Sequence, residues 1–241
     1  MLNDKERDVI QKIVDFGGYV TTLILGQYVK DTDRNLRYIL SNLTQEGLIR
    51  RVDLSRNPNV HTVYQVTKKA CIMCNRGDSH MRKKHTPPFA ARALLKSHFL
   101  FKLAGEGFNQ IFSSPAVRAE YLKSLGFDEK VLPHKYNKGT SLLQIEEYIL
   151  SGEPYSSSGG ICVVHPDKCD VTALTQLITL FERYEGMLSC SPVRINFLAV
   201  CEDKQRAREY ELAGQRIIGG TRGDGGDHPL VVGYSIDYRY Y

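Results

Sequence analysis

The chain has 241 residues, 42% of them apolar, with 32 Lys and Arg against 27 Asp and Glu, which is enough for two domains with a core each. No run of about 18 consecutive apolar residues occurs and the N-terminus is polar, so we expect neither a membrane span nor a secretory signal and predict a cytoplasmic location. Six cysteines in such a chain are typical of reduced thiols rather than of a disulfide framework.

Three helices are predicted before residue 47. Apolar residues recur at helical spacing from Asp4 to Phe16, and the pair Gly17-Gly18 is a typical helix end. Threonine or aspartate caps begin a short second helix after residue 21 and a third after residue 32. The third helix ends at Gly47 and has an apolar stripe made of Leu36, Ile39, Leu40 and Leu43.

Two strands are predicted directly after the third helix. Residues 48–52 and 62–66 have strand composition and flank a polar tip at residues 55–59. Three helices followed by a hairpin are typical of a winged helix-turn-helix, in which the hairpin is the wing. The sequence therefore predicts a winged-helix domain over residues 1–70 that binds double-stranded DNA.

The predicted third helix carries side chains that suit the major groove, because Arg and Asn offer paired donors and acceptors to base edges. These are Arg34, Asn35, Arg37 and Tyr38. Side chains on or beside the wing suit phosphate or minor-groove contact, and these are Arg50, Arg51, Arg56 and His61. Residues 1–100 hold 17 Lys and Arg against 9 Asp and Glu, whereas residues 101–241 hold 15 against 18. The positive charge thus lies where DNA contact is predicted, although a winged helix that binds only protein remains the alternative.

A cysteine and histidine pattern follows the hairpin. Its members are Cys71, Cys74, His80 and His85, which have the ligand types and spacing of a tetrahedral zinc site. We favour the alternative, in which Thr67 opens a short helix with the two cysteines as small core residues. The basic residues that follow then form a linker over residues 71–88, which ends at Pro87-Pro88.

Residues 89–241 are predicted to form an α/β domain with a mixed sheet. The predicted helices cover residues 89–103, 116–125, 172–187 and 204–213. The predicted strands cover residues 142–150, 160–165, 194–202 and, at an edge, 232–238. The glycine-rich segment 219–226 lacks the ending of a P-loop and is expected to be a mobile loop.

Three segments of the first 70 residues carry a family resemblance. They are KERDVIQKI, NLRYILSNLTQEGLIRRV and HTVYQVTKKA. They resemble the N-terminal winged helix of the replication-relaxation family of plasmid and mobile-element proteins, which includes the MOB-C class of conjugative relaxases. In that family a helix with a histidine follows, similar to SHFLFKL with His98 here, and then an α/β domain related to the PD-(D/E)xK restriction-endonuclease fold.

The resemblance covers residues 1–100 well and is weaker beyond them. It implies a mobilisation protein that binds and nicks or relaxes origin-of-transfer DNA by metal-dependent phosphodiester chemistry. Other mobilisation or coupling proteins are its implied partners, and a homodimer is one assembly that it allows.

The nuclease core of that fold holds Mg²⁺ or Mn²⁺ with clustered carboxylates, and a lysine helps polarise the attacking water. The chain departs from the pattern, because the nearest match to the family's Pro-Asp pair is Pro133-His134. The catalytic candidates are His98, His134, Glu146, Glu147, His165, Asp167 and Lys168, and the metal-ligand candidates are Glu146, Asp167 and Asp170. His98 also suits a buried core position, and Asp170 suits a helix N-cap.

Two hypotheses follow for the function. The first is a DNA-nicking mobilisation enzyme, favoured by the resemblance and by the His, Asp, Glu and Lys side chains between residues 134 and 170. The second is a non-enzymatic DNA-binding regulator or accessory protein, whose α/β domain is a degenerate nuclease scaffold for dimerisation or partner contact. The altered Pro-Asp pair supports the second. The sequence contains no H-x-H pair, so a conventional relaxase with a tyrosine nucleophile is disfavoured.

Overall fold

The computed structural model describes residues 2–52, 62–76, 86–107, 111–112, 115–124, 134–137, 140–143, 148–151, 161–166, 195–221 and 231–235. The chain divides into two compact units, and the division falls between Asn109 and Gln110. Both units contain helices and strands, so the chain is of mixed α and β structure, as predicted.

Three helices of the first unit begin at side-chain caps. They are α1 (Asp4–Asp15), α2 (Thr22–Val29) and α3 (Asp33–Gln45). Before α1, the Asn3 side chain accepts the backbone N–H of Glu6, and the Glu6 carboxylate accepts the N–H of Asn3. Before α2 and α3, the hydroxyls of Thr21 and Thr32 accept backbone N–H groups of the first turn. The three predicted helices are confirmed.

A three-stranded antiparallel sheet completes this part of the first unit. Its strands are β1 (Tyr19–Val20), β2 (Ile49–Val52) and β3 (Val63–Val66), in the order β1-β3-β2. The predicted hairpin strands are confirmed, whereas its tip lies outside the described residues. The sequence did not predict β1, because two residues are too few for a periodic pattern.

The core of the first unit lies between the helices and the sheet. The stripe predicted for α3 is buried, and so are the inward residues of α1 and all residues of β1 and β3. The fully buried members of this core include Val9, Ile10, Ile13, Leu40, Leu43, Val20 and Val66. Burial of one face of α3 leaves its opposite face for solvent or a ligand.

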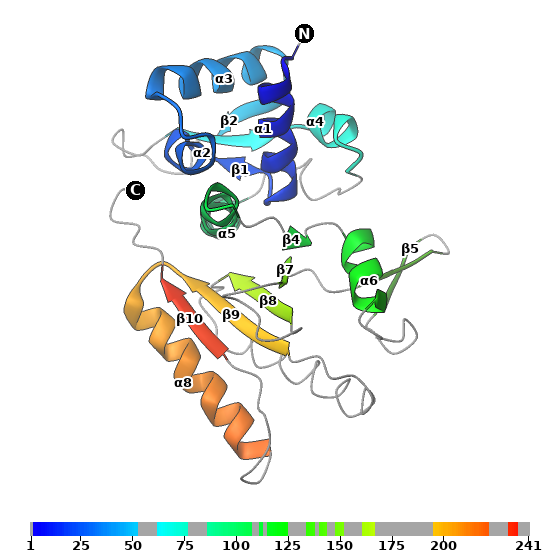
Figure 1. The fold of residues 1–241 in the computed structure, drawn as a ribbon, viewed down its shortest axis with the longest axis vertical. Helices are drawn as coiled ribbons and strands as arrows, with labels where there is room; N and C mark the ends of the chain where they lie inside the picture. Colours follow the sequence, from blue (N-terminus) through cyan, green and yellow to red (C-terminus); the bar gives the residue numbers. More distant parts are fainter. Residues whose placement is uncertain are drawn as a thin grey trace. The chain divides into compact units, whose positions relative to one another are not determined.

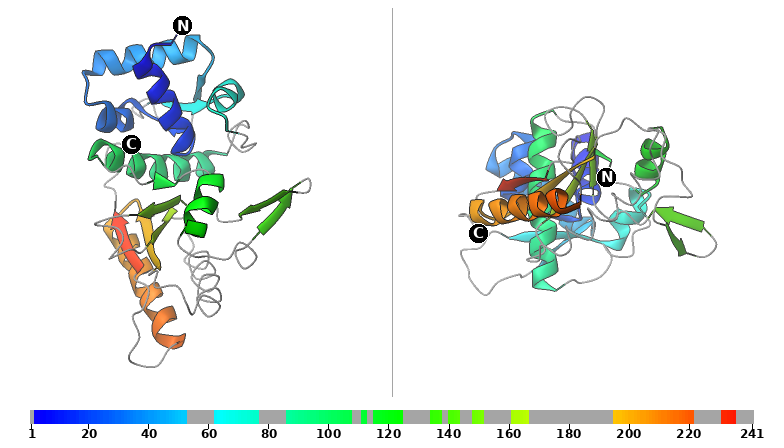
Figure 2. Two further views of the ribbon diagram at one scale, coloured as in Figure 1. Left: turned by 45° about the vertical axis from the view of Figure 1, so that its right-hand side comes forward. Right: turned by 90° about the horizontal axis from the view of Figure 1, so that it is seen from below.

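Helix α5 (Pro87–Gly105) belongs to the first unit. It lies along the side of the β1-β3-β2 sheet away from α3 and contacts α2 and β1 (Figures 1 and 2). The ring of Phe101 meets Phe16 edge-on with centroids 5.0 Å apart, and the Ser97 hydroxyl donates to the carbonyl oxygen of Tyr19 at 2.6 Å.

These contacts correct the predicted boundary at Pro87-Pro88. The sequence assigned the 89–103 helix to the second domain because a proline pair precedes it. The structure puts that helix in the first unit, because its apolar side chains cover a sheet face and α2. The short helix predicted from Thr67 is present as α4 (Lys68–Met73).

The second unit contains a mixed five-stranded sheet and a separate hairpin. The sheet consists of β4 (Ile111–Phe112), β7 (Tyr148–Ser151), β8 (Ile161–Pro166), β9 (Ile195–Cys201) and β10 (Val231–Ser235). Its order is β10-β9-β8-β7-β4, with β8, β9 and β10 parallel and the other pairs antiparallel. The hairpin pairs β5 (His134–Asn137) with β6 (Thr140–Leu143). The predicted mixed sheet is confirmed, with β10 at an edge.

Two helices of the second unit pack on these strands. They are α6 (Pro115–Ser124), which contacts β4 and β6, and α8 (Lys204–Thr221), which contacts β9 and β10 (Figure 1). Asp203 caps α8 by accepting the backbone N–H of Arg206 at 2.7 Å. Across the α6 contact, the rings of Phe112 and Tyr121 stack with centroids 3.9 Å apart.

Two predictions for the second unit are wrong in detail. The strand expected over residues 142–150 is divided between β6 and β7. Helix α8 extends to Thr221, beyond the predicted end at Ala213 and into the segment expected to be a loop. Gly214 is buried in α8, and packing against β9 and β10 outweighs the low helix propensity of glycine. The helix predicted over residues 172–187 lies outside the described residues.

In the described ranges, no helix is long and apolar enough to cross a membrane.

Candidate nucleic-acid interface

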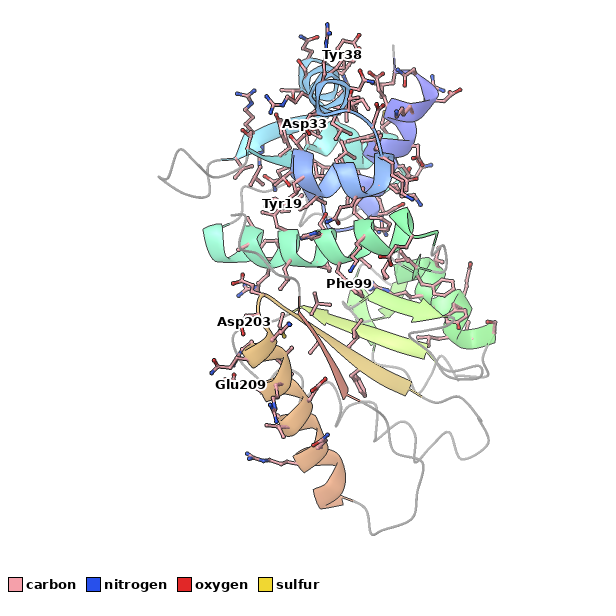
Figure 3. All side chains as sticks on the ribbon, turned by 60° about the vertical axis from the view of Figure 1, so that its left-hand side comes forward. Tyr19, Asp33, Tyr38, Phe99, Asp203 and Glu209 are labelled. Atoms are coloured by element: carbon pink, nitrogen blue, oxygen red, sulfur yellow. The ribbon has the colours of Figure 1, made fainter. Side chains whose placement is uncertain are left out.

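The outer face of α3 presents the four side chains that the sequence assigned to base contact. Arg34, Asn35, Arg37 and Tyr38 are all exposed, and Tyr38 has 63% of its surface accessible. Figure 3 shows Tyr38 projecting from α3 on the side away from the sheet. A large aromatic side chain so exposed on a helix is available for contact with a ligand.

Asp31, in the turn before α3, connects three parts of the first unit. One carboxylate oxygen pairs with the Lys5 ammonium of α1 at 2.5 Å. The other accepts the backbone N–H of Thr32 at 2.7 Å and the side-chain Nδ2 of Asn35 at 2.9 Å. The hydrogen bond from Lys5, and then those from Asn35 and Thr32, lower the pKa of Asp31 to about 2. The sequence analysis missed Asp31, although an aspartate beside a threonine cap is a signal for such a turn.

Arg37 forms an ion pair with Asp33 one turn earlier in α3. The nitrogen and oxygen are 3.6 Å apart, and both side chains are about three-quarters exposed. Exposed pairs of this kind contribute little to stability. The Arg37 guanidinium is therefore able to exchange Asp33 for a phosphate oxygen at small cost.

The two arginines of β2 have different surroundings. Arg50 donates two hydrogen bonds to the side-chain oxygen of the buried Gln65, at 3.2 and 2.9 Å. Burial raises the pKa of Tyr19 to about 12, although the nearby Arg50 charge partly opposes this shift. Arg50 and Arg51 are both exposed, but the contact with Gln65 gives Arg50 a structural role that the sequence did not predict. Arg56 and His61 lie outside the described residues.

His98, a catalytic candidate, lies in α5 and belongs to the first unit. Only 7% of its surface is exposed, and its Nε2 atom contacts the side-chain amide of Gln27 in α2. Burial, and then the Lys102 charge, lower the pKa of His98 to about 4. The imidazole is therefore neutral at pH 7, and this environment matches the core position that the sequence analysis gave as the other interpretation.

The depressed pKa of His98 predicts a loss of stability in acid. The unfolded chain binds a proton near pH 6.5 and the folded chain only near pH 4, so the folded state binds fewer protons between these values. The free energy of unfolding of the first unit should therefore fall by up to about 3 kcal/mol as the pH falls from 6.5 to 4. Urea unfolding of the full chain, with hydrogen exchange in α5 as the probe, measures this loss.

A His98→Gln variant serves as the control, because it removes the titrating ring. Its stability in the first unit should vary less over the same interval. The Asp31 carboxyl has a pKa of about 2 in the folded chain and 3.8 as its ordinary value, so most of its contribution to stability is lost below pH 4. An unchanged pH dependence in the variant would contradict the conclusion that the lowered pKa of His98 causes the loss of stability in acid.

The remaining catalytic candidates are only partly described. His134 is in β5 of the two-stranded hairpin, whereas His165 is in β8 of the five-stranded sheet. These two histidines therefore belong to different sheets. The other candidates for catalysis and metal binding lie outside the described residues, and they are Glu146, Glu147, Asp167, Lys168 and Asp170.

Of the four candidate zinc ligands, only the two cysteines lie in the described residues. Cys71 is buried in α4, and Cys74 is the half-buried residue that ends it. Burial, and then the nearby Asp15 charge, raise the pKa of the Cys74 thiol to about 11, which favours the protonated thiol over a metal-binding thiolate. His80 and His85 lie outside the described residues. In the part of the chain that is described, no group of three or more His, Cys, Asp or Glu side chains is placed to hold a metal ion.

No protein-family model matches the chain, and no curated protein matches it. One solved structure that is similar is the 2,4-dichlorophenol-bound crystal form of an organohalide-sensing transcriptional regulator, with 17% sequence identity and a TM-score of 0.27. The match covers 52% of this chain and 61% of the regulator.

Proposed function

We propose that the protein is a DNA-binding regulator or accessory protein. In this proposal the elements from α1 to β3 form a winged helix-turn-helix that binds double-stranded DNA, with α3 in the major groove and the β2-β3 hairpin as the wing. The observation that carries the proposal is the division of α3 into a buried apolar stripe and an exposed face with Arg34, Asn35, Arg37 and Tyr38.

The placement of these side chains suits the way such a helix contacts DNA. The N-terminal part of a recognition helix meets the base edges, and Arg34 and Asn35 are in the first turn of α3. Tyr38 lies one turn further along the same helix. Arg51 is exposed on β2, a strand of the hairpin, and a cation on the wing suits phosphate. The surplus of positive charge in residues 1–100 favours association with a polyanion.

The role of the second unit is part of the proposal. The family resemblance suggests a restriction-endonuclease-like scaffold and an element-borne protein that acts at a transfer origin. We propose that this unit serves partner contact or dimerisation rather than DNA cleavage, because the Pro-Asp pair of the nuclease pattern is replaced here by Pro133-His134.

The proposal predicts a loss of DNA affinity when the α3 arginines are removed. The double variant Arg34→Ala/Arg37→Ala should bind duplex DNA about 10- to 100-fold more weakly at low salt, with a smaller slope of log affinity against log salt. Fluorescence anisotropy with the whole 241-residue chain and a labelled duplex of about 30 base pairs measures both the affinity and its salt dependence.

A matched control removes two exposed arginines of α8, Arg208 and Arg216. This variant carries the same change of charge outside the proposed interface and should keep most of the affinity. Equal losses in the two double variants would mean that binding follows net charge alone and would contradict the role of α3.

The proposal also predicts the absence of nicking. Supercoiled plasmid carrying the origin of the source element should stay supercoiled with the protein and Mg²⁺, Mn²⁺ or EDTA. Metal-dependent open circles that disappear in Asp167→Ala or Glu146→Ala would instead establish the mobilisation enzyme and locate its carboxylates.

A further inference from the structure

The side chain of Asn35 is held in one orientation on the exposed face of α3. Its Nδ2 donates to Asp31 Oδ1 at 2.9 Å. A carboxylate only accepts hydrogen bonds at neutral pH, so the amide nitrogen of Asn35, and not its oxygen, must face Asp31. The lowered pKa of Asp31 keeps the carboxylate ionised.

This arrangement leaves the rest of the amide for recognition. An asparagine amide has two N–H hydrogens and an oxygen with two lone pairs. The hydrogen bond to Asp31 takes one N–H, so the second N–H and Oδ1 remain for a ligand at the exposed helix surface. One donor beside one acceptor is the pattern that asparagine offers to the N7 and N6 positions of adenine in the major groove.

We propose that Asn35 reads an adenine base and that Asp31 is the positioning residue that fixes its amide for this contact. The inference rests on the proposed function and adds to it one base and one supporting residue. Asp31 restricts the Asn35 side chain before DNA arrives, which lowers the entropic cost of the base contact.

The charges around Asp31 make this arrangement compatible with a polyanion. A bare carboxylate at a DNA-facing turn repels phosphate. The Lys5 ammonium at 2.5 Å offsets the charge of Asp31, and Arg37 offsets that of Asp33. Asp31 before α3 and Asp33 in its first turn are therefore each paired with a cation, and Arg34 adds a positive charge.

The test begins with selection of preferred duplexes by the full-length protein from a random pool. Binding to the selected duplex is then measured with every A·T pair changed in turn, and with 7-deazaadenine, which lacks the N7 acceptor, at each adenine. The wild-type protein should lose roughly 10-fold in affinity at one adenine for either change. The Asn35→Ala variant should show no further loss at that adenine.

Variants of Asp31 distinguish a role in orienting the Asn35 amide from a role in maintaining the fold. Asp31→Ala should reduce the preference for that adenine several-fold while changing binding to the A·T-substituted duplex little. Asp31→Asn keeps an acceptor oxygen for Asn35 and should restore the preference. Asp33→Ala is the matched control, because it removes a carboxylate two residues away that pairs with Arg37, whereas the hydrogen bond of Asn35 goes to Asp31, and it should keep the preference.

The outcomes are distinguishable. An unchanged base preference in Asn35→Ala, or equal loss of the adenine preference in Asp31→Ala and Asp33→Ala, would overturn the inference while leaving DNA binding by α3 intact. Absence of binding to any duplex by the wild-type protein would overturn the proposed function itself.

Discussion

Replacing Gly105 with alanine is expected to destabilise the first unit by about 3 kcal/mol, in the upper part of the range for overpacked sites. Gly105 lies where α5 passes the backbone of α2. A Cβ atom at this position would lie 2.1 Å from the carbonyl oxygen of Gln27 and 3.0 Å from its carbonyl carbon. Backbone atoms cannot rotate away as a side chain does, so the helices must separate.

Hydrogen exchange in α2 and α5 of the whole chain, measured in increasing urea, gives the change in the free energy of unfolding of this unit. A local probe is needed because a chain with two compact units does not unfold in one step. Gly26→Ala in α2 is the matched control. Its Cβ would meet only the end of the Leu36 side chain, at 3.3 Å, and alanine favours the helix. Equal stability of the two variants would contradict the close approach of α5 to α2.

Replacing Phe101 with alanine is expected to cost the first unit about 3 to 5 kcal/mol. Phe101 is fully buried, and its ring contacts Phe16 and Tyr28 edge-on, with centroids 5.0 and 5.9 Å away. The substitution leaves a cavity between α5 and α2 and removes both aromatic contacts. The same exchange measurement should show faster exchange in α1, α2 and α5.

Phe89→Ala provides the control on the same helix. Phe89 is 37% exposed, so its removal should cost much less than that of Phe101. If Phe101→Ala instead destabilised the β9 and β10 strands and left α2 unchanged, α5 would belong to the second unit, as the sequence first suggested.

The second unit was predicted less completely. Strands β8 and β9 were expected almost at their observed bounds, because four or more apolar residues in a row mark a buried strand. No pattern in the sequence predicted the order of the strands in the sheet. The nuclease candidates remain predictions, because Glu146, Asp167 and Asp170 lie outside the described residues.

For the first unit, local signals were enough to predict the three helices, the caps of α2 and α3, and the outer face of α3. Thr21 and Thr32 satisfy N–H groups within three residues of themselves, and the stripe from Leu36 to Leu43 repeats every three or four residues. Such signals are local, so they can be read without knowledge of the fold.

The packing partners of these elements could be identified only in the folded chain. Gln27 and His98 are 71 residues apart in sequence, and Arg50 meets Gln65 across two strands. No local pattern encodes such a partner, because the contact depends on which faces the folded chain brings together. For that reason the sequence predicted where α5 begins and that it is apolar, whereas the fold alone showed that it covers the sheet of the first unit.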